Sequence, residues 1–173
     1  MGQVSLIIHV LLATVLVGPQ ILMFLAVAPA SWLIEDDDLR TSVVRVIAKR
    51  FAALTVIALV GLVITGLIQF FDEAVVPPDI RESMGHYRWG QIFMAKMTLV
   101  VVLVAMIGVH GAVLAKRIGQ VTEEVKAGRL DRSELEKARR NSMLFSALMI
   151  LVSIAILALG VSLAYYPYAD VAL

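Results

Sequence analysis

Four long apolar segments separated by charged connections form the main pattern of this chain. They lie near residues 4–28, 51–71, 91–115 and 143–165. About 20 helical residues cross the roughly 30 Å hydrocarbon core of a membrane. Backbone polar groups in hydrocarbon need partners within the segment, so unbroken segments of this length favour helices over strands. The pattern predicts an all-α protein in which residues 1–173 form a single transmembrane domain, an integral membrane four-helix bundle.

The first segment is expected to be a retained helix and not a cleaved signal peptide. No Lys or Arg precedes it, and its apolar stretch is longer than a signal-peptide core. Ala28-Pro29-Ala30 only faintly resembles a cleavage site. Pro19, which follows Gly18 inside this segment, is expected to kink the helix.

Basic residues are distributed unevenly among the connections. The first connection carries four and the third carries eight, whereas the second carries only Arg81 and Arg88. The positive-inside rule then places the first and third connections in the cytoplasm and both termini outside. We expect a multi-pass protein of the bacterial cytoplasmic (inner) membrane. The aromatic residues expected at the membrane boundaries are Tyr87, Trp89, Tyr165, Tyr166 and Tyr168 on the outer side and Trp32 on the inner side.

The third connection has helical features of its own. Hydrophobic residues keep helical spacing before Ala127-Gly128, which is typical of a helix end. Asp131 followed by Glu134 resembles a capping box that opens a new helix. We therefore expect the third and fourth helices to extend as a cytoplasmic helical hairpin near residues 116–142, either as a simple connector or as a docking surface for a neighbouring subunit.

Small residues within the segments predict close packing of helices. Ser146, Ser153 and Gly160 recur every seven residues in the fourth segment, and Gly61 and Gly66 lie in the second. Small side chains let membrane helices approach each other closely. We interpret these positions as helix-packing positions.

Composition narrows the possible chemistry. The chain is 60% hydrophobic and its mean hydropathy is +0.89, whereas soluble domains are about half apolar. The absence of cysteine excludes disulfides, thiolate metal sites, c-type haem attachment and cysteine-ligated iron–sulfur clusters. The net charge of +1 and the lack of a basic tail argue against nucleic acid as a partner. Any bound metal must use His, Met, Lys or carboxylate ligands.

Three ionisable residues lie within the apolar segments, namely His9, Lys96 and His110. Such residues are costly in hydrocarbon and usually mark a functional site, and imidazole is the usual protein ligand of haem iron. At about 1.5 Å per residue, His9 and Lys96 both lie roughly 8–9 Å below the outer boundary and could share one site. His110 lies about 21 Å further along the helix than Lys96, on the same face. One haem cannot take both histidines as axial ligands in straight helices, so the sequence allows one outer site or two sites.

Further candidate ligands surround the outer end of the third segment. The thioether of Met94, which clusters with Met84 and Met97, is a possible ligand of haem iron or Cu(I), although most membrane methionines serve packing. His86, in the outer loop, is either a solvated residue or a ligand.

Anion partners and the outer loop complete the candidate site. Lys96 is expected to snorkel outward or to pair with a haem propionate, and a role as a ligand or base is the third reading. Arg88 is a second candidate partner for a propionate. The acidic outer loop is either simply solvated or a docking surface for a basic partner such as a soluble cytochrome.

Several short motifs resemble a known superfamily of four-helix membrane proteins, the CopD-like copper-resistance proteins and the HemJ-type protoporphyrinogen oxidases. The motifs that carry this resemblance are His9-Val10-Leu11, Val17-Gly18, Arg50-Phe51, Thr65-Gly66-Leu67, Trp89-Gly90-Gln91, Ala95-Lys96 and His110-Gly111. The resemblance covers most of the first three helices. It implies haem or copper chemistry with His and Met ligands.

Three positions depart from the HemJ-like pattern. Met94 stands where the His of a His-x-Lys motif is expected, Val109 where a Tyr is expected, and Pro19 where a second glycine is expected. These departures favour haem binding over protoporphyrinogen oxidation. The favoured interpretation is a haem b-binding membrane subunit, with one haem or two, that carries electrons in a larger complex of other membrane subunits. The alternatives are a HemJ-type oxidase, a CopD-like copper transport protein and a cofactor-free structural subunit; a subunit role is favoured over a stand-alone enzyme.

Overall fold

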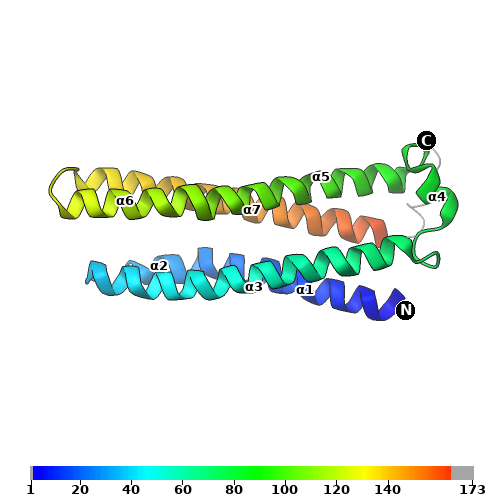
Figure 1. The fold of residues 1–173 in the computed structure, drawn as a ribbon, viewed down its shortest axis with the longest axis horizontal. Helices are drawn as coiled ribbons and strands as arrows, with labels where there is room; N and C mark the ends of the chain where they lie inside the picture. Colours follow the sequence, from blue (N-terminus) through cyan, green and yellow to red (C-terminus); the bar gives the residue numbers. More distant parts are fainter. Residues whose placement is uncertain (1, 165–173) are drawn as a thin grey trace. The chain divides into compact units, whose positions relative to one another are not determined.

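The computed structural model describes residues 2–164, and it is all-α over that range (Figure 1). Tyr165, Tyr166 and Tyr168 lie outside the described residues. Of the short elements, η1 and η3 are π-helical and η2 is a 3₁₀ turn. The elements in order are α1 Gly2–Leu22, η1 Met23–Val27, α2 Ala28–Ser31, α3 Asp37–Phe71, α4 Pro78–Glu82, η2 Met84–His86, α5 Arg88–Val109, η3 His110–Leu114, α6 Ala115–Lys126 and α7 Arg132–Ala164.

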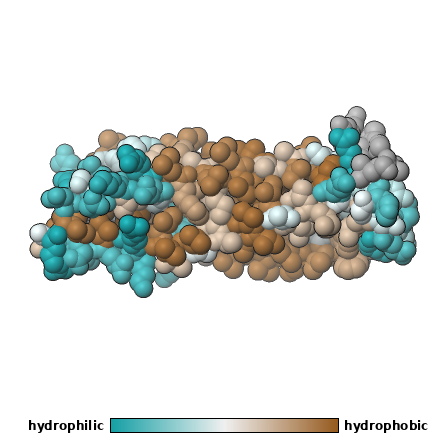
Figure 2. Space-filling model, turned by 90° about the horizontal axis from the view of Figure 1, so that it is seen from above, coloured by the Kyte–Doolittle hydropathy of each residue, from teal (hydrophilic) through white to brown (hydrophobic). Residues whose placement is uncertain are grey.

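Four helical stretches are long and apolar enough to cross a membrane. They span Gln3–Ser31, Asp38–Phe71, Arg88–Lys126 and Arg132–Ala164. Hydrophobic side chains cover the middle parts of the helices on the face drawn in Figure 2, and hydrophilic ones gather towards the helix ends. The predicted all-α architecture with four candidate transmembrane helices is confirmed. The chain therefore has the architecture of a multi-pass membrane protein whose apolar helices suit contact with a lipid bilayer.

The described residues divide into two compact units. The first comprises residues 2–93 and 161–164, and the second comprises Met94–Gly160.

The first unit is built on the antiparallel pair of α1 and α3 (Figure 1). Leu16 on α1 and Ala58 on α3 are buried on the facing sides of this pair. Gly61 permits the close approach, because a Cβ there would lie 2.6 Å from Leu12 Cδ1. The packing role predicted for Gly61 therefore agrees with the structure, as expected for small residues between membrane helices.

Two places in the helices have wider, π-helical turns. Pro19 lies inside α1, and η1 begins at Met23, four residues later. The second π segment, η3, begins at His110. Both proline and π-helical turns bend helices, and π segments are frequent at functional sites.

The loop after α3 folds into a small apolar cap. Val76, Ile80 and Trp89 are buried together in it. Gly90 is essential to this fold, because a Cβ there would lie 1.9 Å from the carbonyl oxygen of Met84. The backbone of η2 therefore packs directly on the first turn of α5.

In the second unit, α5 faces α7, and on each helix the facing residues are seven positions apart. Leu103 on α5 and Ser153 on α7 are 2% and 1% exposed. Lys96 Nζ lies 3.7 Å from the position of a Cβ on Gly160. Two of the small residues predicted as packing positions of the fourth helix, Ser153 and Gly160, thus face the inside of this unit.

The turn between α6 and α7 follows the predicted helix end. Gly128 has a φ of +71°, a left-handed conformation that glycine adopts without strain. Its N–H donates to Val125 O over 3.0 Å, and the N–H of Arg129 donates to Glu124 O over 2.9 Å. These bonds satisfy carbonyls at the end of α6, as in a glycine C-cap. The next helix, α7, begins directly after Asp131.

Candidate functional site

His9 on α1 is held by a hydrogen bond across the first unit. Its Nδ1 lies 2.7 Å from Thr65 Oγ1 on α3. The Thr65 hydroxyl has one proton, and its oxygen also lies 2.7 Å from the carbonyl oxygen of Gly61, which can only accept. If Thr65 donates to Gly61, then His9 Nδ1–H must donate to Thr65. This network assigns the proton of neutral His9 to Nδ1 and a lone pair to Nε2.

Neighbouring polar groups extend this contact into a cluster between the two helices. Ser5 Oγ donates to the carbonyl oxygen of Thr65 over 3.3 Å, and Gln69 Nε2 donates to the carbonyl oxygen of Ser5 over 3.4 Å. We call Ser5, His9, Thr65 and Gln69 the His9 cluster. On each helix its two members are four residues apart, so they lie on one face. The cluster is thus built from the same faces that pack α1 against α3.

A small residue lies directly beside the imidazole of His9. A Cβ on Gly66 would come within 3.6 Å of His9 Cε1, which is an ordinary van der Waals distance. Gly66 therefore leaves the edge of the ring uncrowded by a side chain from α3. The Thr65-Gly66 pair thus supplies the acceptor for His9 and a small residue beside its ring.

The His9 cluster shares one feature with metal-ligating histidines, a ring N–H that donates to an oxygen atom. Such histidines usually donate one ring N–H to a nearby acceptor, which fixes the tautomer and the ring orientation. The other nitrogen of the neutral ring is then the ligand atom. In His9 that atom is Nε2, so the ring can supply one axial ligand to haem iron or one imidazole ligand to copper.

His110 lies in the second unit at the first position of η3. Its ring is stacked on that of Phe145, with centroids 6.0 Å apart and an angle of 11° between the planes. Its Nδ1 is buried and makes no hydrogen bond within the part of the chain that the structure describes. An unsatisfied buried donor would be costly, so we place the proton of the neutral ring on Nε2.

Lys96 is half-buried between α5 and α7. Its Cε and Nζ lie 3.9 and 3.7 Å from the position that a Cβ on Gly160 would occupy. A larger residue at position 160 would therefore crowd the amine. Gly160 thus serves to accommodate a charged side chain as well as to pack helices.

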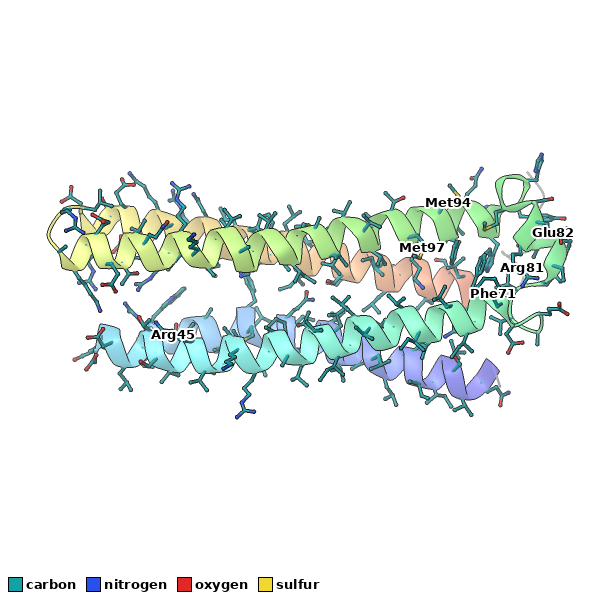
Figure 3. The ribbon with its side chains drawn as sticks, in the orientation of Figure 1. Arg45, Phe71, Arg81, Glu82, Met94 and Met97 are labelled. Atoms are coloured by element: carbon teal, nitrogen blue, oxygen red, sulfur yellow. The ribbon has the colours of Figure 1, made fainter. Side chains whose placement is uncertain are left out.

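The remaining predicted ligands lie at or near the N-terminal end of α5. Met94 and Met97, both labelled on α5 in Figure 3, are 59% and 43% exposed. His86 ends η2 and is exposed, and Arg88 begins α5 and is also exposed. Met84 packs against the apolar cap, which explains it without any ligand role.

The candidate residues divide between the two units. His9, His86 and Arg88 belong to the first, whereas Met94, Lys96 and His110 belong to the second. A shared site of His9 and Lys96 therefore stays a prediction. Within residues 2–164, no group of three or more His, Asp or Glu side chains is placed to hold a metal ion.

Sequence reasoning did not identify the role of Thr65 or Phe145. Thr65 was noted only as part of the motif Thr65-Gly66-Leu67. A hydroxyl group in a predicted membrane helix is itself a signal, because such a group needs a hydrogen-bond partner. Comparison of the chain with protein-family models, curated proteins and solved structures found no match.

Proposed function

We propose that this chain is a haem b-binding subunit of a membrane redox complex, in which His9 Nε2 would be a ligand of the haem iron. The observation that carries the proposal is the contact of 2.7 Å between His9 Nδ1 and Thr65 Oγ1. Haem b would supply one-electron transfer by cycling between ferrous and ferric iron.

Each protein group has a defined part in this proposal. His9 would bind the iron, and Thr65 would hold the imidazole in the tautomer that presents Nε2. Gly66 lies beside the ring, where a Cβ would be at an ordinary contact distance from Cε1. Arg88, in the same unit as His9, is the proposed partner for a propionate, since a fixed positive charge offsets a carboxylate in a medium of low dielectric constant. A part for Lys96 at this haem stays a prediction from the sequence.

The sequence predicts that Met94 or His86 would supply the second ligand of this haem, whereas His110 would hold a haem of its own. A thioether or an imidazole can fill this position. If His110 holds a haem of its own, the subunit carries two. Substituting each of the three in turn distinguishes these possibilities by the shift or loss of haem absorption.

The proposed topology follows from the distribution of Lys and Arg. The turn between α6 and α7 lies in the cytoplasm, and the loop after α3 lies outside. The cytoplasmic hairpin made by α6 and the first part of α7 is then available to neighbouring subunits. The acidic outer loop is available to a basic soluble cytochrome.

Absorption spectroscopy of the purified chain tests the proposal. We expect a Soret band in the wild type and its loss in His9→Leu. Thr65→Val should weaken haem affinity by about tenfold to hundredfold, the range found when an outer partner of a metal ligand is removed. A wild-type protein that takes up no haem during expression with added haem precursor would refute the proposal.

The same preparation separates the alternatives that the sequence left open. Bound copper without haem would favour a CopD-like role. Rescue of a strain that lacks its protoporphyrinogen oxidase would favour a HemJ-type enzyme. Intact assembly in His9→Leu, with no cofactor in either protein, would favour a structural subunit.

A further inference from the structure

The N-terminal part of α3 carries a pair of exposed basic residues, and the acidic residues of this helix, Asp37 and Asp38, both lie in its first turn. Arg45 and Lys49 are both exposed, and they are four residues apart on one helix face. No Asp or Glu occurs from residue 39 to residue 71. Figure 3 shows Arg45 and Phe71 towards opposite ends of α3. No carboxylate from residue 39 to the end of α3 therefore neutralises the charges of Arg45 and Lys49.

The same helix face continues as an exposed apolar stripe. Val56, Val60, Val63 and Leu67 are each more than half exposed. Starting from Lys49, the successive steps to these four residues are seven, four, three and four positions. These steps keep all of them on the same side of an α-helix as Lys49. The opposite side of α3, with Thr55, Ala58 and Thr65, is buried. The charged pair thus lies in line with the exposed apolar stripe of α3.

The depth of these residues matches one leaflet of a bilayer. The apolar segment begins near residue 51, so Lys49 and Arg45 lie about 3 and 9 Å outside it at 1.5 Å per residue. The headgroup layer is about 5–8 Å thick on each side of a hydrocarbon core of roughly 30 Å, so the backbone of Lys49 lies within this layer and that of Arg45 at its outer edge. Val56 and Val60 lie about 8 and 14 Å inside the apolar segment, which is within the roughly 15 Å of one leaflet.

We propose that this face of α3 binds an anionic phospholipid, with its phosphate-bearing headgroup at Arg45 and Lys49 and its acyl chains along Val56 and Val60. Charge complementarity selects the headgroup, and the apolar stripe accommodates the chains. Basic residues beside a membrane helix attract anionic lipids in this way. The proposal does not depend on haem binding.

The test measures contact between this face and lipids with different headgroups. The chain contains no cysteine, so a fluorophore can be attached at Val56→Cys alone. The full chain is reconstituted in phosphatidylcholine that contains a small fraction of phosphatidylglycerol or phosphatidylcholine with brominated acyl chains. Bromine quenches the fluorophore only on close approach, so the quenching reports which lipid occupies the stripe.

We expect brominated phosphatidylglycerol to be preferred by about fivefold for each of the two basic residues. Arg45→Gln with Lys49→Gln should abolish the preference, whereas Arg45→Lys with Lys49→Arg should keep it. A label at Val161→Cys, an exposed position on α7, should show no preference. Circular dichroism of each variant verifies that the helices are intact.

A second charge-removing variant controls for general attraction between the protein and anionic lipid. Lys116→Gln with Arg117→Gln removes the same charge from exposed positions on α6, and the preference at Val56 should remain. Equal quenching by the two brominated lipids in the labelled protein that keeps Arg45 and Lys49 would overturn the proposal. Equal loss of preference in both double variants would also overturn it, because the site would then not be specific to this face.

Discussion

The hydrogen bond between His9 and Thr65 makes the most direct prediction about how α1 and α3 are held together. Thr65→Val removes the hydroxyl and keeps the β-branched shape of the side chain. Thr65 is 6% exposed, so water cannot readily replace its oxygen as the partner of His9 Nδ1. The ring must then either bury an unsatisfied N–H or move its proton to Nε2.

The size of the effect follows from the cost of that loss. Polar bonds between membrane helices contribute about 0.6 kcal/mol on average and up to about 1.7 kcal/mol. A buried donor left without an acceptor costs about 1–3 kcal/mol. We expect Thr65→Val to lower the free energy of unfolding by about 1–2 kcal/mol, because the change of tautomer relieves part of the larger cost.

Equilibrium unfolding of the protein in mixed micelles, followed by circular dichroism, measures this change. Thr98→Val is the matched control, because Thr98 is exposed and its hydroxyl donates within its own helix to Met94 O over 2.9 Å. A double-mutant cycle with His9→Leu isolates the pair and should give a coupling of about 1 kcal/mol. A Thr65→Val effect no larger than that of Thr98→Val, or a coupling near zero, would refute the reasoning.

Two glycine positions yield further predictions, each with a matched control. Gly90→Ala should destabilise the protein by at least about 3 kcal/mol, the upper end for overpacking, because its Cβ would lie 1.9 Å from the backbone oxygen of Met84. Gly85→Ala, with open space around it, should change the melting temperature little. Gly128→Ala should cost about 1–2 kcal/mol because of its positive φ, whereas Gly119→Ala, within helix α6 and uncrowded, should stabilise by up to about 1 kcal/mol. Thermal unfolding curves that rank either pair in the opposite order would contradict the structure.

Hydropathy was sufficient to predict the four long helices, but not where they begin. The second apolar segment starts near residue 51, whereas α3 begins at Asp37. The Asp36 side chain caps it, accepting from the N–H groups of Asp38 and Leu39 over 2.8 and 3.0 Å. A search for apolar residues passes over such a cap, since the first turns of the helix are polar.

The site was only partly predictable for a related reason. His9 is evident in the sequence because an ionisable residue in an apolar segment is rare. Its partner Thr65 depends on how α1 and α3 are aligned, and this alignment involves the contact of Leu12 with Gly61. No single-helix pattern specifies that alignment. The π-helical turns at Met23 and His110 are also invisible to hydropathy, because α and π turns use the same apolar residues.

Haem content per chain tests the central claim, that His9 is an axial ligand of haem b. A pyridine haemochrome assay on the purified protein gives this quantity independently of the ligands in the native state. We predict about one haem or more per chain in the wild type and a large loss in His9→Ala. Haem absent from the wild type, or equal haem content in the wild type and His9→Ala, would contradict the claim.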